Sequence, residues 1–258
     1  MNCWKLTVLG ASSTITPPGD STACLHLDNG KQSILIDAGG NLPALMGEAN
    51  IDYRKITDLI ITHSHPDHCY GLPFLSHAFY HGHRRINGYS SAEAIPRLKK
   101  SLRAFDLETK NRYLDIDFKE INTRQKDTIP AGDKLQIETL PTRHSRPGFG
   151  LKMTGTEQTI VFSSDSAPGE EIIDAAQKAD ILIHDCQGLA AYQRYFAGSH
   201  TNSRKLGEIA RECKVKCLVP FHYNTTELPQ SFHELVAEIR TVYKGLVIKP
   251  AKGLSFFL

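Results

Sequence analysis

Residues 58–68 read DLIITHSHPDH, an apolar run that leads directly into a cluster of histidine and aspartate side chains. The β-branched, apolar start of this stretch is typical of a buried strand. Three imidazoles and one carboxylate follow it, from His63, His65, Asp67 and His68. A folded chain does not normally crowd groups that titrate near neutrality unless a cation compensates them, and both side-chain types are ligands of divalent metals. The stretch therefore predicts a metal site at the end of a strand.

The spacing inside this cluster suits two ions. Alternate residues of an extended turn point the same way, so His63 and His65 can hold one ion. Asp67 and His68 lie past the bend at Pro66 and can hold another. The cluster therefore predicts two neighbouring metal sites.

The segments around the cluster indicate a layered α/β fold. Short β-branched runs bounded by Gly, Pro, Asn or Asp predict strands at 5–10, 23–27, 33–39, 58–63, 135–140, 148–153 and 159–163. Helices are predicted at 71–80 and 92–105. In the second half, predicted helices alternate with predicted strands, the helices at 169–178, 202–213 and 231–243 and the strands at 181–185 and 217–222. This order predicts two packed sheets with helices outside, and polar residues at strand ends, where ligands collect.

Length, charge and cysteine content narrow the class of protein. The 258 residues carry 30 basic and 28 acidic side chains, and their net charge of +2 gives no strong field for nucleic acid or anionic membrane. The sequence shows no signal peptide and no apolar run long enough to span a bilayer. Its six cysteines are scattered, which suits reduced thiols in the cytoplasm. No linker or repeat divides the chain, so we expect a single domain over residues 1–258.

The run HSHPDH resembles the HxHxDH motif of the metallo-β-lactamase superfamily, whose members share a four-layer αββα sandwich and a two-metal site. Later family motifs follow in order, so the resemblance covers nearly the whole chain: His144 in PTRHSRPGFG, Asp165 in FSSDSAP and His222 in LVPFHYN. The resemblance implies that the first ion is held by His63, His65 and His144. It implies that the second is held by Asp67, His68 and His222. Asp165 would then bridge the two ions.

This ligand set implies a hydrolase. Two neighbouring divalent ions can share a water, lower its pKa from about 16 to about 7, and so provide a bridging hydroxide as nucleophile. Ligation by nitrogen and oxygen alone suits Zn²⁺, with Mn²⁺ and Fe²⁺ as alternatives. No cysteine stands at the bridging position, which argues against antibiotic hydrolysis. Asp37, in the DAG run before the motif, either orients a ligand histidine from behind or simply forms a turn.

Further motifs point to one branch of the superfamily. HSRPGFG, from His144 onward, resembles a stretch of ribonuclease Z and its phosphodiesterase relatives. IHDC (183–186) and HTNS (200–203) resemble the paired HEAT and HST motifs of ribonuclease Z. In those enzymes the HST histidine lies over the scissile phosphate and helps to protonate the leaving alcohol. The resemblance implies that His200 is this acid, supported by Asp185, and that both join Asp67 as candidate catalytic residues. Alternatively, His200 merely caps or precedes the helix at 202–213.

The chain also departs from the ribonuclease Z pattern. Residues 149–165 run straight from the HSRPGFG stretch to Asp165, which leaves no room for the arm that grips tRNA. DAGGN replaces the DCGEGTQ-like segment of the family. An armless relative that cleaves a cyclic phosphate carries an N-terminal cysteine cluster, whereas this chain has only Cys3 and Cys24 in that region. These differences argue against tRNA processing and leave the substrate open.

We therefore expect a cytoplasmic phosphodiesterase that acts on a small cyclic nucleotide, a sugar phosphate or an RNA end. The family resemblance implies a homodimer, and we expect no membrane partner. One alternative is a thioester or lactone hydrolase of the same fold, which would not need His200 with Asp185. Another is a metal-binding regulatory member without activity.

Overall fold

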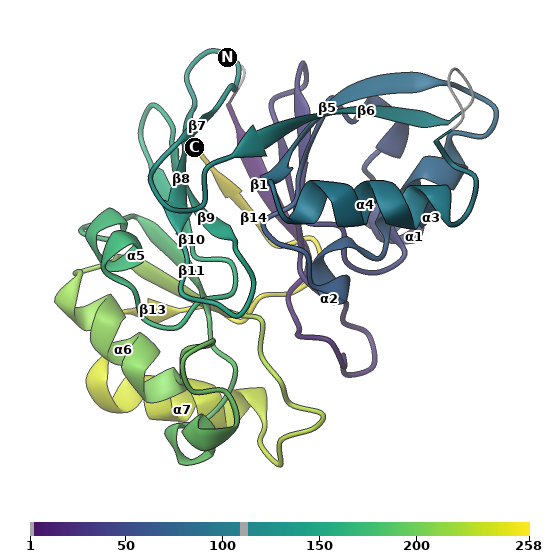
Figure 1. The fold of residues 1–258 in the computed structure, drawn as a ribbon. Helices are drawn as coiled ribbons and strands as arrows, with labels where there is room; N and C mark the ends of the chain where they lie inside the picture. Colours follow the sequence, from purple (N-terminus) through teal and green to yellow (C-terminus); the bar gives the residue numbers. More distant parts are fainter. Residues whose placement is uncertain (1–2, 109–112) are drawn as a thin grey trace.

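Two seven-stranded sheets form the centre of the computed structural model, which describes residues 3–108 and 113–258 (Figure 1). The first sheet has the order β14-β1-β2-β3-β4-β5-β6. Its strands are β1 (Lys5–Gly10), β2 (Cys24–Asp28), β3 (Ser33–Ile36), β4 (Asp58–Ile60), β5 (Arg84–Ser91), β6 (Leu114–Ile121) and β14 (Ser255–Phe257). The second sheet has the order β13-β12-β11-β10-β9-β8-β7. Its strands are β7 (Thr128–Ile129), β8 (Gln136–Pro141), β9 (Phe149–Thr154), β10 (Thr159–Phe162), β11 (Ile181–Asp185), β12 (Cys217–Phe221) and β13 (Leu246–Val247).

Both sheets change from antiparallel to parallel pairing along their width. In the first sheet β1, β2 and β3 pair antiparallel, and β3 to β6 are parallel. In the second sheet β8, β9 and β10 pair antiparallel, and β10 to β13 are parallel. The carboxyl ends of parallel strands meet at one edge of a sheet, where ligands bind in open α/β folds. Polar residues that end or follow these strands are therefore brought together, namely Asp37, His63, Asp165, Asp185 and His222.

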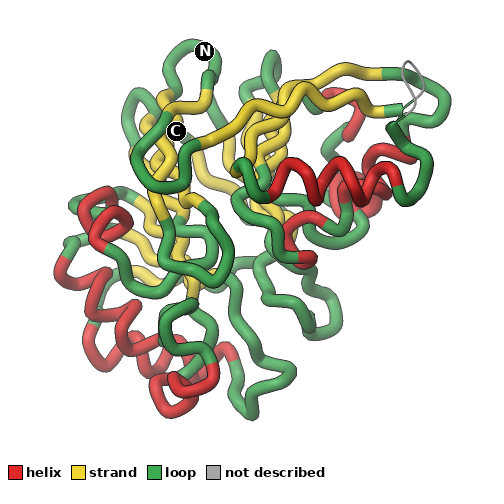
Figure 2. The backbone as a smooth tube through the Cα atoms, viewed as in Figure 1, coloured by secondary structure: helices red, strands yellow, loops and turns green. Residues whose placement is uncertain are grey.

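Helices cover the outer face of each sheet. The first sheet carries α1 (Leu42–Glu48), α3 (Leu72–Ala78) and α4 (Ala94–Arg103) on the right of Figure 1. The short α2 (Pro66–Cys69) contains Asp67 and His68. The second sheet carries α5 (Glu170–Ala175), α6 (Ser203–Glu212) and α7 (Phe232–Val242). Two 3-10 turns complete the elements, η1 (Tyr53–Lys55) and η2 (Ala190–Tyr195). Figure 2 shows the strands gathered between the two groups of helices. The αββα sandwich expected from the sequence is confirmed.

Two apolar clusters hold these layers together. The larger cluster joins the facing sides of the two sheets and includes Trp4, Phe149 and Phe162, each at most 1% exposed. The smaller cluster lies between the first sheet and its helices and includes Leu42 and Leu98. Such burial of large apolar side chains is the main favourable term in folding.

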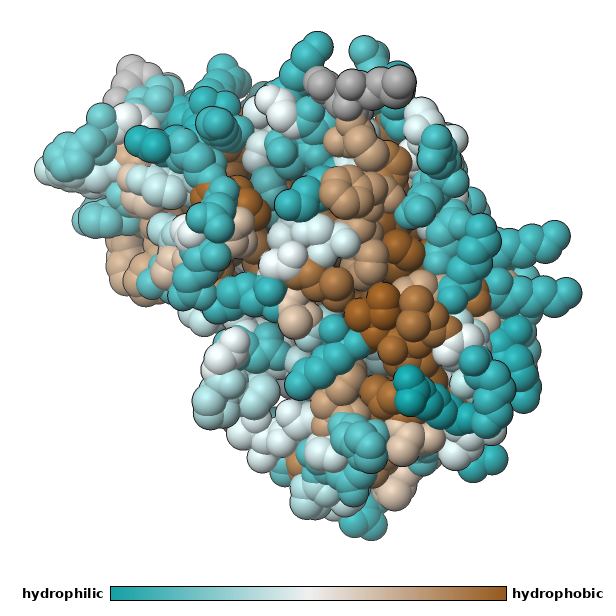
Figure 3. Space-filling model, turned by 180° about the vertical axis from the view of Figure 1, so that it is seen from behind, coloured by the Kyte–Doolittle hydropathy of each residue, from teal (hydrophilic) through white to brown (hydrophobic). Residues whose placement is uncertain are grey.

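The surface is mostly hydrophilic. Figure 3 shows the rear face covered largely by hydrophilic side chains, with an apolar strip down its middle. The large apolar side chains that the described residues expose include Leu246 and Phe257 on the edge strands β13 and β14. Among the described residues, no helix is both long and apolar enough to cross a bilayer.

The sequence predicted most elements to within a few residues but missed several. The strands β5 and β6 and the helix α1 were not expected, and neither were the short β7, β13 and β14. The predicted strand at 58–63 is shorter than expected, since β4 ends at Ile60. His63 therefore lies in the loop that follows the strand.

Candidate metal centre

Four ligand atoms converge where β4, β8 and β10 end. His63, His65, His144 and Asp165 each offer one atom, and these atoms lie within 4.8 Å of one another. His65 Nδ1 is 3.1 Å from His63 Nε2 and 2.9 Å from His144 Nε2. Asp165 Oδ2 is 3.7 Å from His63 Nε2 and 3.9 Å from His144 Nε2. A tetrahedral Zn²⁺ bound at about 2.0–2.1 Å would separate its ligand atoms by about 3.3 Å, so this group fits one ion.

A second group lies against the first. Asp67, His68 and His222 also place their ligand atoms within 4.8 Å of one another. His222 Nε2 is 3.1 Å from Asp67 Oδ2, and His68 Nε2 is 4.0 Å from the same oxygen. Asp165 faces this group too, since its Oδ2 is 3.2 Å from His222 Nε2 and its Oδ1 is 3.3 Å from His68 Nε2. Asp165 thus stands between the two groups, as a bridging carboxylate would.

Two buried polar atoms at this junction support a bound cation. His68 Nε2 and Asp165 Oδ1 are shielded from solvent and have no hydrogen-bond partner among the described residues. Buried polar atoms are nearly always satisfied, because leaving one unpaired costs about 1–3 kcal/mol. A divalent ion between these atoms would satisfy both. The residues therefore fit a divalent-metal site.

The electrostatics of the cluster agree with this fit. Burial disfavours the charge on Asp165, yet the imidazoles of His222 and His68 hold the pKa of this carboxyl well below its usual range. Burial alone would raise the pKa of Asp67, but the hydrogen bond with His222 outweighs this effect, and the pKa lies below its usual range. Burial lowers the pKa of His63 well below its usual value, and neighbouring His68 adds to the effect. His68 differs from His63, because the lowering effect of burial on its pKa is outweighed by the Asp165 and Asp37 carboxylates, which raise it well above the usual value. Metal binding at His68 would therefore displace a proton.

Asp37 holds His68 from behind. Its Oδ2 is 2.8 Å from His68 Nδ1, and its Oδ1 accepts a hydrogen bond of 2.8 Å from the Thr62 backbone N–H. Thr62 Oγ1 also donates to Asp37 Oδ2 at 3.0 Å. A carboxylate in this position fixes the tautomer and the orientation of a ligand histidine. Of the two expected roles of Asp37, the structure shows the orienting one.

Other outer contacts were not foreseen from the sequence. His63 Nδ1 lies 3.1 Å from Thr62 Oγ1, and His222 Nδ1 lies 3.1 Å from Gln187 Oε1. His144 Nδ1 donates to the Ser199 carbonyl at 2.9 Å. Thr62 adjoins the motif and could have been suspected. The Ser199 carbonyl and Gln187 meet their histidines only through the tertiary fold, so no local pattern signals them.

His200 and Asp185 lie beside both groups. His200 Nδ1 is 2.9 Å from Asp185 Oδ2, and the Asp185 side chain is fully buried. The His200 ring is parallel to that of His222, with 5.2 Å between centroids and 3° between planes, and is edge-on to His144 at 4.9 Å. Burial lowers the pKa of His200, but the Asp185 carboxylate raises it to about 9. His200 is thus paired with a buried carboxylate directly beside the ligand groups.

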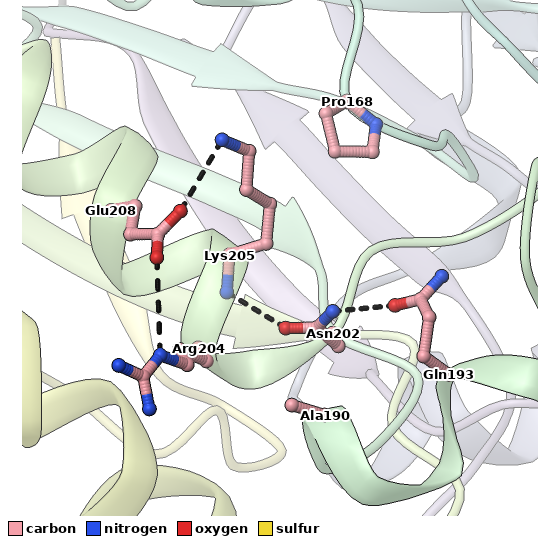
Figure 4. Close-up of a pocket in the computed structure, with 7 residues that line it drawn as sticks. All are labelled: Pro168, Ala190, Gln193, Asn202, Arg204, Lys205 and Glu208. Atoms are coloured by element: carbon pink, nitrogen blue, oxygen red, sulfur yellow. Dashed lines mark hydrogen bonds and ion pairs between the residues drawn. The ribbon is translucent and has the colours of Figure 1, made fainter.

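The segment that carries His200 leads into α6, and Figure 4 shows the residues at the start of this helix. Asn202 is the N-cap of this helix, where its side chain accepts a hydrogen bond of 2.7 Å from the Lys205 backbone N–H and donates to Gln193 of η2. His200 is therefore not the cap. These contacts border a cavity of about 300 Å³ lined by Pro168, Ala190, Gln193, Asn202, Arg204, Lys205 and Glu208.

All ten predicted side chains at the site are thus close in space. The structure brings together the seven predicted ligands, His200 with Asp185, and Asp37. The assignment of each ligand to a particular ion stays a prediction.

Comparison with known proteins gives the family. The family model described as anti-Pycsar protein Apyc1 matches residues 4–245. The chain belongs to the Apyc1 family. The Apyc1 protein of Bacillus phage BSP38 is 28% identical over 65% of this chain and 70% of its own length. Ribonuclease Z of Archaeoglobus fulgidus is 24% identical over 95% of both chains.

The fold has close structural neighbours. The crystal structure of the metallo-β-lactamase fold protein YhfI from Bacillus subtilis matches with a TM-score of 0.84 and 23% identity, covering 100% of both chains. This Apyc1-family chain is therefore a metallo-hydrolase of the metallo-β-lactamase fold, related to ribonuclease Z.

Proposed function

We propose that this Apyc1-family chain is a phosphodiesterase that uses two divalent ions, with Zn²⁺ as the favoured metal. Its substrate would be a small cyclic or nucleotide-type phosphodiester or an RNA end. The observation that carries the proposal is the pairing of His200 with buried Asp185 directly beside the two ligand groups. A thioester expels a thiolate, which leaves without a proton, whereas a phosphodiester has a poor alkoxide leaving group that a positioned acid can protonate.

The proposal gives each part of the site a role. His63, His65 and His144 would hold one ion, Asp67, His68 and His222 the other, and Asp165 both. When bound, such a pair of ions lowers the pKa of water and neutralises charge that grows on the phosphoryl oxygens.

The protein's own groups would handle the proton of the leaving alcohol. His200 Nδ1 is held by Asp185 Oδ2, so Nε2 is the nitrogen available to the substrate. Asp185 Oδ2 also accepts a hydrogen bond of 3.0 Å from the Ser166 backbone N–H, which keeps the carboxylate turned toward His200. The ring is confined between His222 and His144. These contacts favour one orientation of the acid before substrate arrives.

The test is a comparison of substrate classes on metal-quantified protein. Bis(p-nitrophenyl) phosphate, a p-nitrophenyl ester and a thioester would be assayed with wild-type, His200→Ala and Asp67→Ala proteins. We expect about two ions per chain, preference for the diester, and strong loss of diesterase activity in Asp67→Ala. The loss in His200→Ala should be smaller on this substrate, because p-nitrophenolate leaves without a proton. A preference for the thioester together with a near-neutral His200→Ala would indicate the thioester hydrolase instead. Full metal content without turnover of any substrate would indicate a regulatory protein.

A further inference from the structure

The segment at residues 11–22, between β1 and β2, contacts the second ligand group directly. Thr14 Oγ1 donates a hydrogen bond of 3.1 Å to Asp67 Oδ2. The same oxygen lies 3.1 Å from His222 Nε2. Thr14 is exposed, whereas the Asp67 side chain is buried. A hydroxyl from the rim of the site thus contacts a buried carboxylate of the second ligand group.

Thr14 completes a pattern in the second group, in which each ligand has one polar partner outside the group. His68 is held by Asp37, and His222 lies against Gln187. Thr14 has the same position for Asp67. Partners of this kind orient ligands before the metal binds, and losing one typically weakens metal affinity by about 10- to 100-fold.

The segment that presents Thr14 is tied to the end of β12, which carries His222. The His222 backbone N–H donates to the Ala11 carbonyl at 2.7 Å, and that of Ser13 donates to the Tyr223 carbonyl at 3.2 Å. Asp20 Oδ2 accepts a hydrogen bond of 2.6 Å from Ser12 Oγ and another from the Tyr223 hydroxyl. Both ends of the segment are therefore anchored to the strand end that supplies a ligand.

We propose that Thr14 is a positioning residue for Asp67, and that the contact between Asp20 and Tyr223 holds it in place. The segment at 11–22 then sets the affinity of the second ligand group for its cation. This inference rests on the two-metal arrangement in the proposed function. It concerns metal binding, so it can be tested without any substrate.

The test is a two-step Zn²⁺ titration of metal-free protein against a competing chelator. Thr14→Val keeps the shape of the side chain and removes the hydroxyl, and Thr14→Ser keeps the hydroxyl. Ile15→Ala, at a neighbouring exposed residue, is the matched control. We expect Thr14→Val to weaken one binding step by about 10- to 100-fold and to leave the other within about twofold. Thr14→Ser and Ile15→Ala should titrate like the wild type, and Tyr223→Phe should weaken the same step by less than Thr14→Val.

The outcomes separate this inference from the proposed function. Wild-type protein that binds one ion per chain would overturn the two-metal arrangement. Wild-type protein that binds two ions, with Thr14→Val unchanged, would overturn the role of Thr14 alone. Equal weakening of both steps would also overturn it, as would a metal-free Thr14→Val protein that melts well below the wild type, because either result indicates a general structural effect.

Discussion

Three residues other than glycine around the metal centre have a left-handed backbone: Asp37 at φ 60°, Ser164 at φ 53° and His222 at φ 54°. Such a conformation costs a residue with a Cβ atom of the order of 1 kcal/mol or more, and it persists where the surrounding structure imposes it. Each of the three lies just beyond a strand, where the chain must turn its side chain or its neighbour toward the ligands. Backbone strain therefore accompanies the placement of the site.

Asp37 provides the first test at this scale. Asp37→Asn keeps the size of the side chain and tolerates a positive φ, but it removes the negative charge behind His68. We expect metal affinity to fall by about 10- to 100-fold, measured by competition with a chelator. Asp58→Asn is the matched control, since Asp58 is also buried and accepts hydrogen bonds from Gln32 and Asn87. Unchanged metal affinity in Asp37→Asn would contradict the orienting role.

His26 gives a pH prediction away from the metal centre. Its ring is buried in β2 with Nε2 2.7 Å from Ser33 Oγ, and burial lowers its pKa from 6.5 to about 4, against a smaller opposing effect of Asp28 and a further lowering by Lys5. As pH falls below 6.5, the unfolded chain takes up this proton first, so stability is lost between pH 6.5 and 4 and is fully present above pH 6.5.

The expected loss can be measured by urea unfolding. Between pH 7 and pH 5 the His26 contribution should fall by about 2 kcal/mol. His26→Gln keeps a polar group for Ser33 but does not titrate, so its unfolding free energy should fall correspondingly less over the same range. Identical pH profiles for the two proteins would show that His26 is not neutral in the folded state.

At the scale of elements, the start of α6 connects helix stability with the site. Asn202 caps this helix and lies two residues beyond His200. Asn202→Ala should lower the free energy of unfolding by about 1 kcal/mol and also lower hydrolytic activity, because the His200 segment loses its contact with η2. Ser231→Ala removes the capping box of α7 and should cost similar stability with full activity. Equal activity of the two variants would show that the cap of α6 does not support the site.

The sequence predicted strands well where almost every residue is buried and poorly where the strand is partly exposed. The strands β1, β11 and β12 are almost wholly buried and were predicted to within a residue. The peripheral strand β6 exposes much of its length, and Arg85 near the start of β5 pairs with Asp115 and Asp117 of β6. A Cβ atom at Gly88 in β5 would lie 2.5 Å from the Ile116 side chain and 2.7 Å from the Phe118 ring, a tertiary contact that no local pattern reveals. In β6 the apolar residues Leu114, Ile116 and Phe118 do alternate with charged ones, so the sequence held a signal for this strand that the prediction overlooked.

The site residues also divide into those that the sequence could reveal and those that it could not. The seven candidate ligands could be found because metal chemistry restricts them to a few residue types in a compact motif. Thr14, Gln187 and the Ser199 carbonyl could not, since hydroxyl, amide and backbone groups occur everywhere along a chain. Their roles depend on which loops the two sheets bring together.

At the scale of the whole molecule, the ligands come from both halves of the sandwich. His63, His65, Asp67 and His68 follow strands of the first sheet, and His144, Asp165 and His222 follow strands of the second. A bound ion would therefore join the two sheets at one edge. The single domain over residues 1–258 and the homodimer stay predictions.

Metal removal tests this joining role. A ligand present at about a thousandfold above its dissociation constant stabilises the folded state by about 4 kcal/mol, or roughly 10 °C in Tm for a chain of this size. We expect a chelator to lower Tm by this amount and Zn²⁺ to restore it. Asp165→Ala should abolish most of the shift, while His26→Gln should retain it. A Tm that does not respond to metal would contradict a cation between the sheets.

If His200 protonates the leaving alcohol of a phosphodiester, the effect of replacing it must depend on the leaving group of the substrate. The kcat of metal-loaded wild-type and His200→Ala proteins would be compared on a 3′,5′-cyclic nucleotide, which has an alkoxide leaving group, and on bis(p-nitrophenyl) phosphate, which leaves without a proton. We predict that the substitution lowers kcat on the cyclic nucleotide by about 100- to 10,000-fold and on the aryl diester by far less. Equal losses on both substrates, or no loss on the cyclic nucleotide, would contradict the assignment of His200 as the acid.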